Sequence, residues 1–147
     1  MQAKKLYFSH AIRGITGSPE EIEKNCRLAT ANAAFMRAYL GPKFVVYCPA
    51  ENDAFPQMAM KKSLLSIENV LAIDCALIEQ SDFVLADTSI LSKGVRKEID
   101  RALGLGILVF RFAGLSELKT GCDFIREMAR GVSTATTAVT LKEYGHE

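Results

Sequence analysis

Three short stretches of this sequence carry side chains whose types and spacing could do chemistry. The first, YFSHAIRG, begins at Tyr7 and passes from an apolar segment into a polar, basic loop within a few residues. Its Arg13 offers a planar guanidinium that suits a phosphate or a carboxylate, and Gly14 lets the backbone approach such an anion closely. An ordinary surface arginine after a strand explains the same pattern, so both interpretations stay open at this point.

The second stretch, SKGVRKEI, begins at Ser92 and predicts the start of a helix. The Ser92 hydroxyl and the amides that follow it could hold a hydroxyl or a phosphate group, because the N-terminus of a helix favours negative charge. Glu98 lies one to two turns into this helix, within a run of charged residues typical of a solvated helix face. The spacing therefore does not separate Glu98 from its solvent-exposed neighbours.

The third stretch, VLAIDCALIEQSDFVL, places Asp74 inside an otherwise apolar helix. Burial disfavours the charged form of a carboxyl, so the pKa of Asp74 should be raised unless the group faces solvent. A carboxylic acid that stays protonated near neutral pH can act as a general acid. Asp74 and Glu98 would then form the pair of carboxyl groups in unlike environments that cleaves glycosidic bonds, with Tyr7 beside them.

Short apolar segments alternate along the chain with longer helical patterns. Most of these segments are rich in β-branched and aromatic residues with little polar alternation, which is typical of strands in a parallel sheet covered on both faces. The last segment alternates polar and apolar residues and is expected to form an edge strand. The five predicted strands are Leu6–Ser9, Phe44–Cys48, Phe83–Asp87, Ile107–Phe112 and Ser133–Leu141.

Start and stop signals delimit the helices between these strands. Ser18-Pro19-Glu20-Glu21 combines an N-cap serine, a proline at the first helical position and a glutamate at the capping-box position. Gly41-Pro42 ends that helix. The other predicted helices cover Pro56–Gln80, with or without a break near Ser66–Asn69, then a segment from SKG to Gly104 or Gly106, and Glu117–Arg130.

The alternation of strands and helices predicts an α/β three-layer sandwich. Its sheet should have five parallel, or mostly parallel, strands in the flavodoxin-like order 2-1-3-4-5. We expect a single domain over residues 1–147. Ligands of such sheets bind beyond the carboxyl ends of the strands, where the strand order reverses. The loops SHAIRG and TSILSKG, after the first and third strands, should therefore flank the binding crevice.

Bulk composition excludes several classes of protein. The 18 basic and 17 acidic residues leave a net charge of +1, which argues against a nucleic-acid polymer or a membrane surface as the partner. No apolar run has the length of a membrane span and no signal peptide is evident, so we expect a cytoplasmic protein. The four cysteines are far apart and only two histidines are present, so we expect reduced thiols rather than disulfides, and no metal site.

The three motifs together resemble those of the nucleoside 2-deoxyribosyltransferase superfamily. In order along the chain they read YFSHAIRG, IDCALIEQSDFVLAD and SKGVRKEIDRALGLGILVF. The chain is most similar to the branch of deoxynucleoside 5′-monophosphate N-glycosidases, whose first strand leads into a similar I-R-G loop. The resemblance implies a hydrolase that needs no cofactor and releases a free base and deoxyribose 5-phosphate.

The resemblance also implies a role for each matching residue. Glu98 matches the family's nucleophile, which attacks C1′ of the deoxyribose, and Tyr7 matches the tyrosine that orients it. Asp74 matches the aspartate that protonates the departing base. The expected substrate-binding residues are Ser9, His10, Ile12, Arg13, Gly14, Ser92 and Gly94, of which Arg13, Ser92 and Gly94 match contacts to the 5′-phosphate.

The loop after the first strand departs from the family pattern. His10 and Ala11 stand where the family commonly has Gly-Ser or Gly-Pro, so one expected phosphate donor is missing. His10 could contact the phosphate itself or serve a structural role. Lys93 could supply replacement charge or be solvated.

Three other functions stay open. A true 2-deoxyribosyltransferase would exchange bases between unphosphorylated deoxynucleosides, and a non-catalytic sensor would only bind a nucleotide in the same crevice. A glycosidase acting on NAD would cleave a related bond, although no nicotinamide-specific feature supports it. The predicted partner is in each case a small-molecule nucleotide or nucleoside. The family's dimers and larger oligomers further imply a homodimer or larger assembly, with the helix of Asp74 near the subunit contact.

Overall fold

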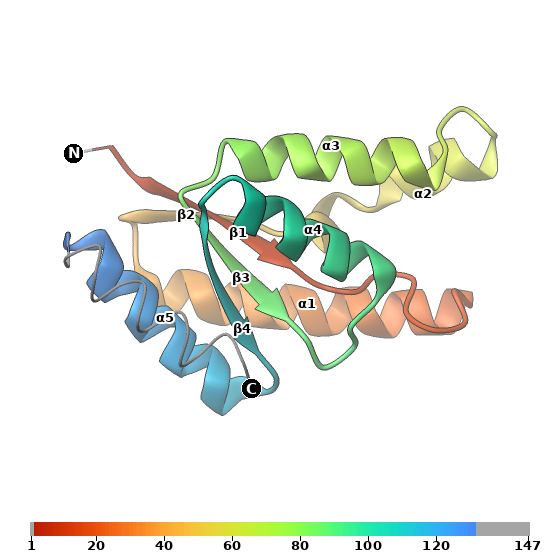
Figure 1. The fold of residues 1–147 in the computed structure, drawn as a ribbon. Coiled ribbons are helices and arrows are strands. Elements are labelled where there is room, and N and C mark those ends of the chain that lie inside the picture. Colours follow the sequence, from red (N-terminus) through yellow and green to blue (C-terminus); the bar gives the residue numbers. More distant parts are fainter. Residues whose placement is uncertain (1, 132–147) are drawn as a thin grey trace.

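A computed structural model describes residues 2–131 of the chain (Figure 1). In this part of the sequence, strands and helices alternate as the apolar segments and capping signals predict. The elements in chain order are β1 (Lys4–Ser9), α1 (Pro19–Leu40), β2 (Phe44–Tyr47), a 3-10 helix η1 (Pro49–Asn52), α2 (Ala54–Lys61), α3 (Ile67–Glu79), β3 (Phe83–Asp87), α4 (Lys93–Gly104), β4 (Leu108–Phe112) and α5 (Leu115–Ala129).

The described strands form one parallel sheet in the order β2-β1-β3-β4. In its register, Tyr7 of β1 lies beside Val84 of β3, and Ser9 lies beside Ala86. The prediction of an α/β fold with a parallel sheet flanked by helices is confirmed, as is the relative order of these strands. The predicted fifth strand, Ser133–Leu141, lies outside the described residues. Because the strand order reverses beside β1, the carboxyl ends of β1 and β3 meet where a ligand is expected.

Side chains of the sheet alternate between two apolar layers. Leu6 and Phe8 of β1 pack with α1 and α5, whereas Tyr7 packs with α3 and α4. Figure 1 shows the same division, with α3 and α4 on one face of the sheet and α1 and α5 on the other. Since every second residue of a strand points to the same face, Ser9 shares the face of Tyr7. Strand β1 therefore delivers both hydroxyls to the layer that holds α3 and α4.

Helix α1 begins as its sequence predicts. The Ser18 hydroxyl accepts a hydrogen bond from the backbone N–H of Glu21 at 3.1 Å, and Pro19 occupies the first helical position. Ser92 is likewise the N-cap of α4, where its hydroxyl accepts from the N–H of Val95. These serines fix where the two helices start, and α4 starts at the edge of the sheet where the strands end.

The helical segment expected over Pro56–Gln80, with or without a break near Ser66–Asn69, forms two helices. Helix α2 starts earlier, at Ala54, and ends at Lys61, and α3 starts only after its N-cap residue Ser66. The break thus precedes the predicted position, and a left-handed backbone at Ser63, with φ of 57°, turns the chain there. Within residues 2–131, no helix combines the length and the apolar character needed to span a membrane.

Candidate active site

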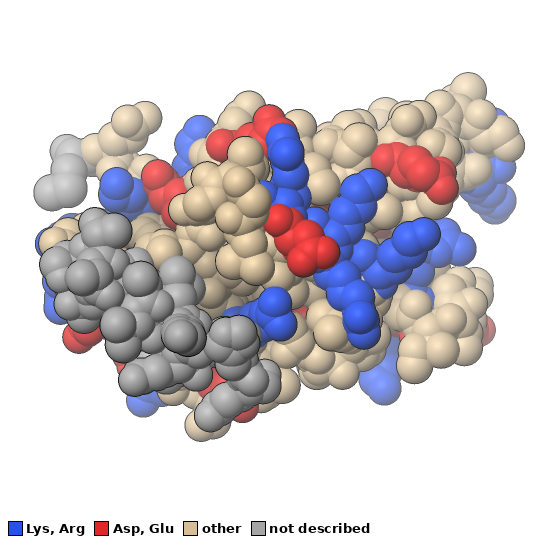
Figure 2. Space-filling view, viewed as in Figure 1, with Lys and Arg blue, Asp and Glu red and all other residues tan. Residues whose placement is uncertain are grey.

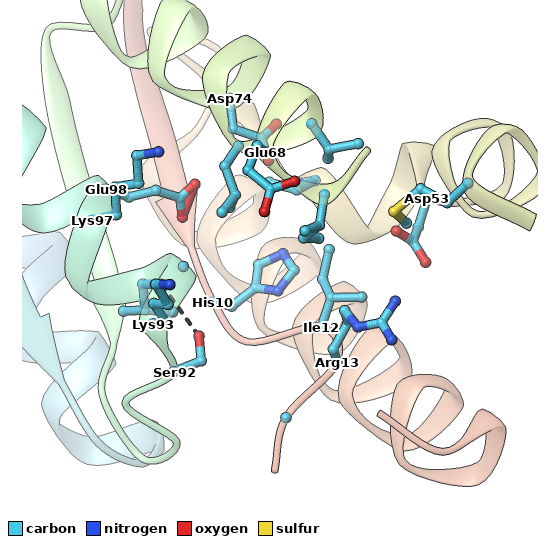
Figure 3. Close-up of a pocket in the computed structure, with 18 of the residues that line it drawn as sticks. His10, Ile12, Arg13, Asp53, Glu68, Asp74, Ser92, Lys93, Lys97 and Glu98 are labelled. Atoms are coloured by element: carbon cyan, nitrogen blue, oxygen red, sulfur yellow. Dashed lines mark hydrogen bonds between the residues drawn. The ribbon is translucent and has the colours of Figure 1, made fainter. Parts of the chain in front are cut away.

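A cavity of about 330 Å³ opens where β1 and β3 end, between α3, α4 and the loop after β1 (Figure 3). Its position is the one that the reversal of strand order predicts. All residues expected to form the site line it except Tyr7 and Ser9, which reach its Glu98 from β1. The lining residues among those expected are His10, Ile12, Arg13 and Gly14 from the loop, Asp74 from α3, and Ser92, Gly94 and Glu98 from the first turns of α4.

Glu98 is the buried carboxyl of this site. Although it belongs to a charged run in the sequence, its side chain lies on the inner face of α4 and is only 4% exposed. The Tyr7 hydroxyl donates a hydrogen bond to Oε2 at 2.7 Å, and the Ser9 hydroxyl donates to Oε1 at 2.8 Å. Each carboxylate oxygen therefore has one donor from β1, and these two hydrogen bonds fix the orientation of the carboxylate.

Opposing effects act on the ionisation of Glu98. Burial raises its pKa to about 7, and the nearby Asp74 carboxyl acts in the same direction. The hydroxyls of Tyr7 and Ser9 act in the other direction, because they donate to the charged form. Burial, followed by the charge of Glu98, raises the pKa of Tyr7 well above its usual value, so Tyr7 remains a donor at neutral pH. The carboxylate is thus available near pH 7 despite its surroundings.

Asp74 is the second carboxyl group of the cavity. It projects from α3 on the same side as Leu71, and Figure 3 shows it pointing toward the cavity from above. Burial, with a smaller contribution from the charge of Asp53, raises its pKa to about 6. Its carboxyl makes no hydrogen bond to any residue that the structure describes. Asp74 can therefore exchange a proton with a bound molecule without first breaking a contact.

Three cations also line the cavity. Arg13 comes from the loop after β1, and Lys93 and Lys97 come from α4. Figure 2 shows Lys and Arg side chains gathered over α4 and near the loop beside its N-terminal end. The N-terminus of α4 adds the partial positive charge of its backbone amides. These cations and the helix N-terminus suit an anionic group, and Glu98 is the buried carboxyl of the same cavity.

His10 lines the cavity, and its ring nitrogens bond to the backbone. Its ring is buried against Phe8, with centroids 4.8 Å apart, and its Nε2 accepts from the backbone N–H of Ala50 at 3.3 Å. Nδ1 therefore carries the proton and lies 3.2 Å from the carbonyl oxygen of Ala11, which accepts it. Burial lowers the pKa of His10, so the ring is neutral. His10 ties the loop after β1 to η1, which explains its place in the motif without a contact to phosphate.

The loop after β1 offers fewer free amides than its sequence suggests. Its chain turns at Gly14, where φ is +66°. The Glu21 carboxylate reaches back from α1 and accepts from the backbone N–H groups of Ile15, at 2.6 Å, and Thr16, at 2.8 Å. Two of the amides that could have held an anion are thus already bonded. Charge on this side of the cavity comes from the Arg13 side chain instead.

Sequence reasoning missed several members of the site. The cavity also takes Asp53, Gln57 and Met60 from one face of α2, where they are three and four residues apart. The predicted helix started at Pro56 and so left Asp53 outside that face. Lys97 and Glu68 of the cavity wall were also missed, and Lys97 belongs to the charged run that is typical of a solvated helix face.

The burial of Glu98 had a signal in the sequence that was not used. Val95, Glu98, Ile99 and Ala102 follow the spacing of one helix face, and all of them are buried. The spacing of two between Tyr7 and Ser9 likewise predicts that both side chains lie on the same face of the sheet.

The arrangement can supply a fixed carboxylate and a separate proton donor to one bound molecule. A pair of carboxyl groups in unlike surroundings is suited to acid–base and nucleophilic chemistry at an acetal-like carbon. In residues 2–131 no group of three or more His, Cys, Asp or Glu side chains is arranged to hold a metal ion. Comparisons of the chain with protein-family models, curated proteins and solved structures give no match.

Proposed function

We propose that this protein hydrolyses the N-glycosidic bond of 2′-deoxynucleoside 5′-monophosphates. The observation that carries the proposal is the Glu98 carboxyl, which is buried at the cavity and oriented by the hydroxyls of Tyr7 and Ser9. A carboxyl held in so unfavourable an environment is typical of a functional group rather than of one that stabilises the fold. The motif resemblance assigns the nucleophile to the same residue.

The reaction proceeds in two steps. A Glu98 oxygen attacks C1′ of the deoxyribose while the C1′–N bond breaks, its electron pair stays with the base, and Asp74 gives the base a proton. Positive charge that develops at C1′ is stabilised by the Glu98 carboxylate before the ester forms. Water then attacks C1′, its proton passes to Asp74, and Glu98 departs as a carboxylate that Tyr7 and Ser9 stabilise. The products are a free base and deoxyribose 5-phosphate.

The charge of the cavity wall supports a phosphorylated substrate. Lys93 and Lys97 lie on α4 near its N-terminus, Arg13 faces the cavity from the loop after β1, and each can neutralise a phosphate oxygen. An arginine has no evident task at an uncharged 5′-hydroxyl. The monophosphate is therefore favoured over an unphosphorylated deoxynucleoside.

Release of free base tests the proposal. The protein is incubated with dGMP, dCMP and dTMP, and base and deoxyribose 5-phosphate are quantified by chromatography. We expect release from at least one of them, with a loss of at least about 10³-fold in Glu98→Gln, which removes the nucleophile. Glu127→Gln, which neutralises an exposed carboxylate on α5, is the matched control and should retain full activity.

The same assay separates the alternatives. No release from any monophosphate, together with base exchange between deoxynucleosides, would identify a transferase. If the protein binds nucleotides without turnover, and Glu98→Gln still binds them, the protein is a sensor. Either result overturns the hydrolase.

We also propose that the protein forms a homodimer or a larger homo-oligomer. Large apolar side chains are exposed along α2 and α3 and the turn between them, namely Phe55, Met58, Leu64, Ile67 and Ile73. Contiguous exposed apolar surface is typical of a subunit contact. Light scattering on the purified protein tests this, and a monomer at micromolar concentration would refute it.

A further inference from the structure

Asp53 stands at the N-cap of α2 without serving as its cap. An aspartate at this position ordinarily accepts a hydrogen bond from a backbone N–H of the first turn, which stabilises the helix. In the part of the chain that the structure describes, the Asp53 carboxylate makes no such bond, and its backbone is already in the helical region, with φ of −76° and ψ of −20°. The side chain is free to lie in the cavity instead, and it lines the cavity wall.

Neighbouring side chains hold the Asp53 carboxylate in place. The amide nitrogen of Gln57 donates to Oδ1 at 3.3 Å, and the Cys26 thiol lies 3.8 Å from Oδ2. Burial raises the pKa of Asp53, whereas Gln57, Cys26 and the charge of Arg13 favour its ionised form. The carboxylate is therefore a hydrogen-bond acceptor whose position is set by its neighbours.

The cavity separates this acceptor from the reacting carboxyl. Figure 3 shows Asp53 on the opposite side of the cavity from Glu98, with Arg13 on the Asp53 side. Apolar side chains of α2 and α3, among them Met60, Ile67 and Leu71, line the same cavity. A nucleotide whose C1′ lies at Glu98 would extend its flat base along these apolar side chains. The far edge of the base would then face Asp53.

We propose that Asp53 selects bases that carry an exocyclic amino group on the edge remote from the sugar. A carboxylate can only accept hydrogen bonds, so it pairs with an amino group and is repelled by a carbonyl oxygen at the same position. The inference rests on the proposed function, because it takes Glu98 to mark the position of C1′. It adds a substrate class, the amino-bearing nucleotides, to that function.

Binding by pairs of nucleotides that carry an amino group or a carbonyl oxygen at this position, with the adjacent ring nitrogen changing from acceptor to N–H donor, tests the inference. Affinities for dCMP and dUMP, and for dAMP and dIMP, are measured by calorimetry in Glu98→Gln, which binds without turnover. We expect the amino-bearing member of at least one pair to bind roughly 10- to 100-fold more tightly, the range for a hydrogen bond to a charged group. Adding Asp53→Asn should reduce that ratio at least about tenfold, because the amide can also donate to a carbonyl oxygen.

Matched variants identify the residue responsible. Asp53→Asn keeps the size of the side chain, and a thermal melt verifies that the variant is folded. Asp100→Asn makes the same change on the exposed face of α4, outside the cavity, and should leave the ratio unchanged. Equal affinity within every pair, no binding of any of these nucleotides, or a ratio removed by Glu68→Gln instead of Asp53→Asn would overturn the inference.

Base release by the wild-type protein is measured separately. Discrimination in binding without any release would uphold the role of Asp53 and refute the hydrolase. Release without discrimination would uphold the hydrolase and refute the role of Asp53.

Discussion

Replacing Glu98 by glutamine should stabilise the folded protein above neutral pH while it abolishes turnover. Burial raises the pKa of this carboxyl from 4.5 to about 7 in the folded state. Below pH 4.5 the carboxyl is protonated in both the folded and unfolded states and contributes nothing to the pH dependence of stability. As the pH rises from 4.5 to 7 the folded state holds the proton and the unfolded state does not, so the free energy of unfolding falls.

The size of this effect follows from the pKa difference. At about 1.4 kcal/mol for each pKa unit, the difference between 4.5 and about 7 corresponds to a loss of about 3 kcal/mol for the wild-type protein above pH 7. Glutamine ionises in neither state, and its amide can still bond to the hydroxyls of Tyr7 and Ser9. We therefore expect Glu98→Gln to match the wild type near pH 4.5 and to be more stable by about 3 kcal/mol at pH 8.

Urea unfolding at the two pH values measures this difference. The wild type, Glu98→Gln and the control Glu127→Gln are compared by circular dichroism, with the slope of the transition checked for two-state behaviour. A stability difference between wild type and Glu98→Gln that is the same at both pH values would refute the reasoning. So would a variant that is less stable than the wild type at pH 8.

Three further outcomes are expected. Activity should follow a bell-shaped pH profile with its maximum between about 6 and about 7, because Glu98 must be ionised and Asp74 protonated. The variant Asp74→Asn should lose the alkaline limb of the kcat profile. A profile that is flat from pH 5 to 8 would contradict both roles. Arg13→Gln should raise KM for the monophosphate by roughly 10-fold or more without affecting an unphosphorylated deoxynucleoside, and an equal rise for both would show that Arg13 does not contact phosphate. His10→Ala should lower the free energy of unfolding by about 3 kcal/mol in urea titrations, because it opens a cavity beside Phe8 and leaves the Ala50 N–H without its acceptor. A change below about 0.5 kcal/mol would rule out the structural role of His10.

Local signals explain why much of the fold could be predicted. The N-caps Ser18 and Ser92 were recognisable because a serine bonds to its own first turn, whatever surrounds it. The strands were recognisable because a parallel sheet requires apolar side chains on both faces. The break between α2 and α3 was misplaced, since the left-handed turn at Ser63 has no glycine or proline to mark it.

Part of the candidate site could also be predicted. The sheet order placed the loop of Arg13 beside the start of α4, and the cavity is found there. The contact of Ser9 with Glu98 and the presence of Asp53 were not predicted. Both depend on how helices pack against the sheet, which no local pattern describes.

The sequence by itself determined the order of the described strands and the starts of α1 and α4, because these depend on residues close together in the chain. The spacing of Val95, Glu98, Ile99 and Ala102 places them on one face of α4, but only the tertiary structure decided that this face packs on the sheet and loses its water. Glu98 meets the hydroxyl of a tyrosine 91 positions away, and only that packing excludes solvent from the carboxyl and raises its pKa to about 7. The ionisation of a group depends on its surroundings in space, and those surroundings exist only once α4 is packed on β1.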